Sequence, residues 1–101
     1  MHYVLQYHFV EDYMERRAPL RNTHLTLAWE AKHRGELVLA GAFAEPADGA
    51  LFIFDGGGPE VAERFAKADP YVTHGLVREW RVRPWTTVVG DLAKNPVHPT
   101  P

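Results

Sequence analysis

The stretch Ala50-Leu51-Phe52-Ile53-Phe54-Asp55 is the clearest strand in this 101-residue chain, and the fold can be worked out from it. Its run of aliphatic and aromatic residues is typical of a strand with buried side chains. Gly56-Gly57-Gly58 ends the strand, and Pro59 suits the first turn of a helix, where its missing N–H costs nothing. This stretch therefore predicts a strand followed directly by a helix.

The sequence before this strand predicts a hairpin. Leu37–Phe43 is a short apolar run that indicates a second buried strand, with Gly41 marking a bulge or a close backbone approach. Glu45–Gly49 contains the turn residues Pro, Asp and Gly and has the length of a hairpin connection. The two strands are therefore expected to pair antiparallel.

The sequence after the strand predicts a helix, a turn and a last strand. The helix is expected to end at about Asp69, because Pro70 disfavours helical geometry in the residue before it. We expect a turn at Tyr71–Gly75. Alternating apolar and polar residues over Leu76–Arg83 then predict a strand.

The N-terminal part of the chain adds one strand and one helix. Tyr3–Val10 alternates with period two, which is typical of a strand with one apolar face. A helix is expected from Pro19 to the basic residues before Gly35, because both ends carry the usual start and stop residues. Its apolar stripe recurs at spacings of four, three and four residues: Leu20, His24, Leu27 and Ala31.

The resulting order, βαββαβ, predicts a ferredoxin-like α+β fold: a four-stranded antiparallel sheet with two helices on one face. The other face would be bare, so we expect a homodimer that packs through the open sheet face. Residues 1–90 form the predicted domain. Residues 91–101, with three prolines, are expected to be a loosely draped tail.

The composition excludes several classes of function. A net charge of -2 leaves no basic surface for nucleic acid or a membrane, and no apolar run is long enough to span a bilayer. The chain has no cysteine and no serine, which excludes thiolate and serine nucleophiles and disulfides. We expect a cytoplasmic protein, because the sequence lacks cysteine and its N-terminus lacks the features of a signal peptide. We expect no metal or cofactor, since His2 and His8 would lie about 20 Å apart and the glycine run lacks the Lys-Ser/Thr of a phosphate loop.

His24 and Asp69 are the candidate catalytic pair. A histidine on an apolar helix stripe is often only structural, and Asp69-Pro70 is also an ordinary helix stop. However, the end of the second helix and the first helix cover the same sheet face, so the two side chains can meet. A carboxylate beside a histidine fixes its tautomer and supports it as a general base. Candidate substrate-binding residues surround the pair: Arg17, Arg21, Tyr71 and His74.

Three segments resemble the YciI-like (YCII-related domain) family. They are Arg21-Asn22-Thr23-His24-Leu25, Gly35–Gly41, and Ala68-Asp69-Pro70-Tyr71 with Gly75-Leu76. The resemblance covers about the first 85 residues. It implies a dimeric α+β barrel similar to muconolactone isomerase, with His24 and Asp69 at the positions of the family's proposed active-site pair. The family usually has a proline after the glycine that ends the second of these segments, Gly41, where this chain has Ala42-Phe43.

Together these observations predict a small enzyme, of the isomerase or lyase type, acting on a small organic acid or a ring-derived anion. His24 would be the general acid and base, Asp69 would orient it, and Arg21 or Arg17 would hold the negative charge. The alternative is a non-catalytic dimeric binding or accessory domain in which His24 and Asp69 form a structural pair. A haem-binding member of the same architecture is a third reading, which a visible absorption band would reveal.

Overall fold

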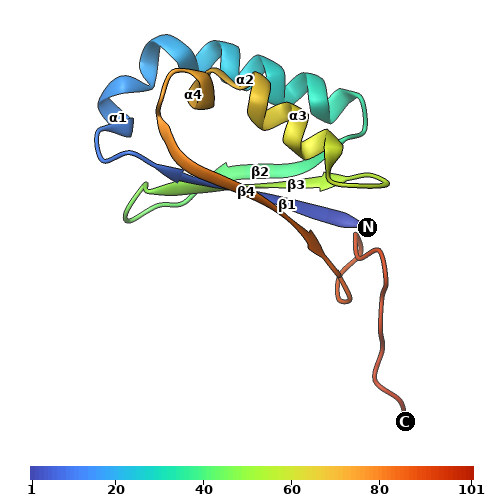
Figure 1. Ribbon diagram of the computed structural model, residues 1–101. Helices are drawn as coiled ribbons and strands as arrows, with labels where there is room; N and C mark the ends of the chain where they lie inside the picture. The colour runs from blue at the N-terminus through green and yellow to red at the C-terminus, as the bar shows by residue number, and fades with distance from the viewer.

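The computed structural model describes all residues from 1 to 101, and it contains one four-stranded sheet. The strands lie in the order β2-β3-β1-β4, and every neighbouring pair is antiparallel. Their bounds are β1 His2–Phe9, β2 Leu37–Ala42, β3 Gly49–Asp55 and β4 Val77–Trp85. The long helix α2 and the shorter α3 lie over one face of this sheet, each accompanied by a single-turn helix (Figure 1). Their bounds are α1 Tyr13–Arg16, α2 Ala18–His33, α3 Glu60–Ala68 and α4 Pro70–Thr73. The ferredoxin-like α+β fold predicted from the sequence is thus confirmed.

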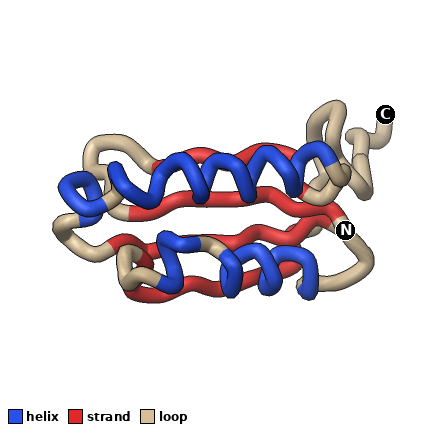
Figure 2. The backbone as a smooth tube through the Cα atoms, turned by 90° about the horizontal axis from the view of Figure 1, so that it is seen from above, coloured by secondary structure: helices blue, strands red, loops and turns tan.

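The ends of α2 follow from its sequence. A proline occupies the first turn, and Lys32 and His33 occupy the last turn, where positive charge suits the helix dipole. Gly35 then adopts a φ of +81°, a left-handed conformation that favours glycine. Seen from above, α2 runs along one side of the sheet and α3 with α4 along the other (Figure 2).

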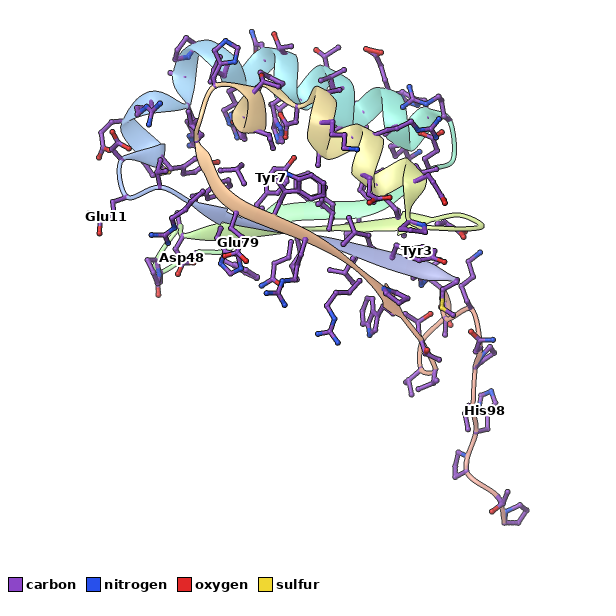
Figure 3. The ribbon with its side chains drawn as sticks, viewed as in Figure 1. Tyr3, Tyr7, Glu11, Asp48, Glu79 and His98 are labelled. Carbon is purple, nitrogen blue, oxygen red and sulfur yellow. The ribbon has the colours of Figure 1, made fainter.

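The core lies between the helices and the sheet. Leu5, Tyr7 and Phe9 of β1 are at most 3% exposed, and they pack with Phe52 and Phe54 of β3. Figure 3 shows Tyr7 pointing from its strand toward the helices, whereas Glu79 of β4 points away from them. The alternation predicted for the first strand therefore separates a buried face from an open one.

The strand predicted at Leu37–Phe43 is not buried as expected. Only Leu37 is buried, and the residues from Leu39 to Ala42 are exposed. The strand order explains this difference, because β2 is at the edge of the sheet and pairs on one side only. An apolar run is therefore compatible with an exposed edge strand in this fold.

The open face of the sheet has no covering layer in the single chain (Figure 1). Val4 on β1 lies between Ile53 and Arg83, its partners on the two neighbouring strands, and cross-strand partners share a face. Leu39 pairs with Ile53 on the same face and is 70% exposed. Packing of a second copy against this face stays a prediction.

The C-terminal segment is held to the sheet more firmly than a draped tail. Thr87 Oγ1 lies 2.9 Å from Nδ1 of His2 and accepts a hydrogen bond from the N–H of Lys94. Val97 N–H donates a hydrogen bond to the carbonyl of Val88, and the C-terminus lies well away from the sheet and the helices (Figure 1). Only the last residues are draped freely, because buried Thr87 anchors the part before them. None of the helices is long and apolar enough to cross a membrane.

Candidate active site

His24 of α2 and Asp69, which follows α3, are in direct contact. Nδ1 of His24 lies 2.9 Å from both Oδ1 and Oδ2 of the carboxylate. The Asp69 side chain is fully buried, and the His24 side chain is 12% exposed. Two residues that are 45 positions apart in the sequence therefore form one hydrogen-bonded pair at the helix–sheet interface.

Asp69 stands at the junction of two helices. The sequence predicted a turn at Tyr71–Gly75, but Pro70–Thr73 forms the short helix α4, with Pro70 at its first position. Asp69 has extended backbone geometry and caps this helix, because Oδ1 accepts the N–H of Tyr71 at 3.1 Å. The N-terminus of α4 favours the negative charge of Asp69, whereas the C-terminus of α3, which precedes it, opposes that charge.

Tyr7 of β1 supplies a third hydrogen bond to Asp69. Its hydroxyl donates to Oδ2 at 2.7 Å. Burial, and then the negative charge of Asp69, raise the pKa of Tyr7, so its hydroxyl keeps its proton and remains a donor. Period-two alternation predicted that Tyr7 is buried, but nothing in the sequence identified its partner.

These contacts determine the tautomer of His24. A carboxylate only accepts hydrogen bonds, so Nδ1 of His24 carries the hydrogen that it shares with Asp69. Nε2 has no partner within the chain, and no buried side-chain nitrogen or oxygen is unpaired, so Nε2 retains contact with open space. In the neutral ring this nitrogen carries a lone pair and can take up a proton.

Aromatic rings fix the orientation of the imidazole. Tyr71 stacks on His24 with 3.9 Å between the ring centres and 7° between the planes. Phe52 and Phe65 approach the same ring edge-on, at 6.0 and 6.3 Å between centres. Burial, and then the neighbouring Tyr13, raise the pKa of Tyr71 to about 12, while Arg17 and Arg21 act in the opposite direction. Tyr71 is therefore a neutral platform under the histidine.

A cavity of about 350 Å³ adjoins His24, between α2 and the β2–β3 side of the sheet. Thirteen of its 18 lining residues are hydrophobic, and its charged lining residues are all cations: Arg17, Arg21 and Lys32. The Arg17 guanidinium lies 5.7 Å from the centre of the Tyr13 ring, a cation–π distance. An apolar cavity with cations and no carboxylate in its wall suits an anionic, partly apolar ligand.

The structure brings five of the six sequence-derived site residues to this place. Arg17, Arg21, His24 and Tyr71 line the cavity, and Asp69 lies behind His24. His74 is exposed and does not line it; it follows the last residue of α4, and its Nδ1 lies 3.2 Å from the carbonyl of Pro70 in that helix.

Sequence reasoning missed two lining residues of α2. Trp29 and Lys32 lie eight and 11 residues after Arg21, which is about two and three helical turns, so helical periodicity counted from Arg21 could have placed them on its side. No group of three or more His, Cys, Asp or Glu side chains that could hold a metal ion is present.

Comparisons with known proteins place the chain in a family. Residues 1–86 match the YCII-related domain. A comparison with curated proteins found no match. Two solved structures have a similar fold. One is 5-chloro-2-hydroxyhydroquinone dehydrochlorinase (TftG) from Burkholderia phenoliruptrix, in complex with 2,5-dihydroxybenzoquinone. It has a TM-score of 0.73 and 16% identity, over 86% of this chain and 95% of that one.

The other structure is protein Atu4242 from Agrobacterium tumefaciens. It has a TM-score of 0.51 and 18% identity, over 93% of this chain and 98% of that one. At these identities the two structures support the fold alone. The match over residues 1–86 covers the whole sheet and all four helices. The chain belongs to the YCII-related domain family.

Proposed function

We propose that the protein is a small enzyme that transfers a proton on a ring-derived or other small organic anion, in an elimination or an isomerisation. One observation carries this proposal. His24 has Nδ1 bound to a buried carboxylate and leaves Nε2 without a partner, beside a cavity whose charged groups are cations. This is the arrangement that general base catalysis needs.

The roles of the side chains follow from their positions. Nε2 of His24 removes a proton from a carbon or hydroxyl of the substrate. The electron pair left behind either expels a leaving group from a conjugated carbon or takes the proton back at another carbon. Asp69 stabilises the imidazolium formed in between, and Arg17 and Arg21 hold the anionic oxygens. Tyr71 keeps the imidazole ring in place by stacking.

The similar fold of the Burkholderia dehydrochlorinase supports the choice of substrate class. That enzyme is described as acting on a chlorinated hydroxyhydroquinone, and it was solved with a dihydroxybenzoquinone. A flat, oxygenated ring with acidic hydroxyls also suits the cavity described above, because its walls are apolar and its charges positive. Hydroxylated aromatic anions are therefore the first substrates to test.

A non-catalytic binding or accessory domain is the second candidate. The observation that favours it is the position of Asp69, whose carboxylate accepts hydrogen bonds from β1, α2 and α4 and so joins three elements. Stability of the fold would then be a sufficient reason for this carboxylate, without any catalytic role. On this alternative the cavity binds a ligand without changing it.

The first assay measures turnover of 5-chloro-2-hydroxyhydroquinone through the release of chloride. The second assay measures proton–deuterium exchange of hydroxybenzoates in heavy water. His24→Asn is expected to lower either rate at least about 100-fold, the usual contribution of a general base. His33→Asn is the matched control, because His33 is exposed on the same helix. Equal rates in His24→Asn and the unchanged protein would refute the proposal. Probe binding without any turnover, together with a lower melting temperature for His24→Asn, would favour the binding domain.

A further inference from the structure

The cavity is longer than a single ring requires. Its lining residues on α2 extend from Arg21 to Lys32, with Arg17 just before the helix, and those on β2 extend from Leu37 to Ala42. Eleven residues separate Arg21 from Lys32, which corresponds to about 16 Å along a helix. Leu37 and Ala42 are five residues apart, again about 16 Å along a strand. Two independent elements thus indicate an elongated groove.

Small side chains make the floor of this groove. Ala40 and Ala42 of β2 pair with Phe52 and Ala50 of β3, and cross-strand partners share a face. Phe52 belongs to the core, so this is the face that α2 covers. Ala40 and Ala42 are nevertheless exposed, because their methyl groups do not reach the helix. We refer to Ala40, Ala42 and Ala50 as the alanine floor.

The charges along the groove are distributed unevenly. His24 lies three residues after Arg21 but eight residues before Lys32. Along the helix it is therefore about 4.5 Å from Arg21 and about 12 Å from Lys32. The part of α2 between His24 and Lys32 contributes only apolar lining residues, Leu25, Ala28 and Trp29. A ligand that reacts at His24 leaves this second half for the rest of its body.

We infer that the substrate is an elongated dianion. Its reacting, anionic end lies above the alanine floor between Arg17, Arg21 and His24, its apolar body runs along Leu25, Ala28 and Trp29, and Lys32 holds a second acidic group at the far end. This inference rests on the proposed function for the position of the reacting end. It adds the length of the substrate and its second charge, neither of which acid–base chemistry at His24 requires.

Three unreactive probes test the inference by calorimetry on the full chain: benzoate, biphenyl-4-carboxylate and biphenyl-4,4'-dicarboxylate. The second ring is expected to tighten binding about tenfold through apolar burial. The second carboxylate is expected to add about threefold through Lys32, as a charge-assisted contact at a partly open site. Because no probe is turned over, the series gives its answer whether or not His24 is catalytic.

Two variants locate the effect. Lys32→Gln should remove the advantage of the dicarboxylate over biphenyl-4-carboxylate, and Lys67→Gln on the exposed side of α3 should leave it intact. Ala40→Leu should weaken all three probes about tenfold, because Ala40 pairs with Phe52 beside His24 and leucine there fills the floor under the reacting end, at a solvent-exposed position where it does not disturb the core. Equal affinity for all three probes would overturn the elongated groove. An equal loss of affinity for all three probes in Lys32→Gln would overturn the role of Lys32 at the far end.

Discussion

Two histidines in this protein, His24 and His2, have similar burial but different hydrogen-bond partners and different access to a cavity. His24 and His2 are both shielded from solvent, and each uses Nδ1 to contact an oxygen 2.9 Å away. The oxygen belongs to the carboxylate of Asp69 in the first case and to the hydroxyl of Thr87 in the second. Only His24 lines the cavity that holds Arg17 and Arg21. Burial and one hydrogen bond at Nδ1 are therefore common to both rings; the carboxylate partner and the position at the cavity wall distinguish His24.

The largest effect is expected from Asp69→Asn. Asparagine keeps the cap on α4, but its amide cannot accept from both Tyr7 and His24, so one buried donor loses its partner. We expect a loss of about 3 kcal/mol in the free energy of unfolding, measured with urea. Asp55→Asn is the matched control, because Asp55 has one strong partner, Lys94, near the surface, and should cost much less. Equal losses of unfolding free energy in Asp69→Asn and Asp55→Asn would show that the buried carboxylate beside His24 is no more important for stability than the surface carboxylate near His2.

Tyr7→Phe should have a smaller effect with a characteristic pH dependence. Loss of a hydrogen bond to a carboxylate is expected to cost about 2 kcal/mol at neutral pH. In the unchanged protein the pKa of Tyr7 is raised, so the folded chain keeps a proton that the unfolded chain loses above its ordinary value of 10.0. Stability should therefore fall as the pH rises above about 10, since the unfolded state then binds fewer protons.

In Tyr7→Phe this alkaline loss should be shallower but still present, because the pKa of Tyr71 is also raised, to about 12. Urea denaturation at pH 8, 10 and 11 measures the slope. A slope identical to that of the unchanged protein would show that the Tyr7 hydroxyl is not held by Asp69.

Thr87→Val should have the smallest effect. It removes the hydroxyl that contacts His2 and accepts the N–H of Lys94, so the C-terminal segment loses its anchor. We expect about 1 kcal/mol of destabilisation and faster proteolysis after Trp85, measured by limited digestion. Binding of probes in the cavity should be unchanged, since Thr87 does not line it. Weaker binding in this variant would mean that the two histidine regions are coupled.

The fold was predictable because its signals are local. Prolines and glycines mark the ends of α2 and α3, and alternation in β1 separates its two faces. The short helix α4 was missed because Pro70 was read only as the end of one helix, although a proline equally suits the first position of the next. The exposure of β2 was missed because an apolar run does not distinguish an edge strand from a central one.

The site was predictable only in part, for a related reason. The sequence indicated His24 through its helix stripe and Asp69 through the segment that contains it. It did not indicate Tyr7, because the partner of a buried tyrosine depends on which helix end packs above its strand. Nor did it predict the groove, which results from three alanines in two strands that become one surface only after pairing.

The alanine floor has a consequence for how such a protein can change over evolutionary time. Its two β2 residues are exposed and contribute nothing to the Asp69 hydrogen bonds, so a methyl or propyl group can be gained or lost there at little risk to folding. Each such exchange would alter which substrates fit while leaving the histidine and its carboxylate intact. Proteins built on this plan can therefore diverge in what they accept long before they diverge in the chemistry that they perform.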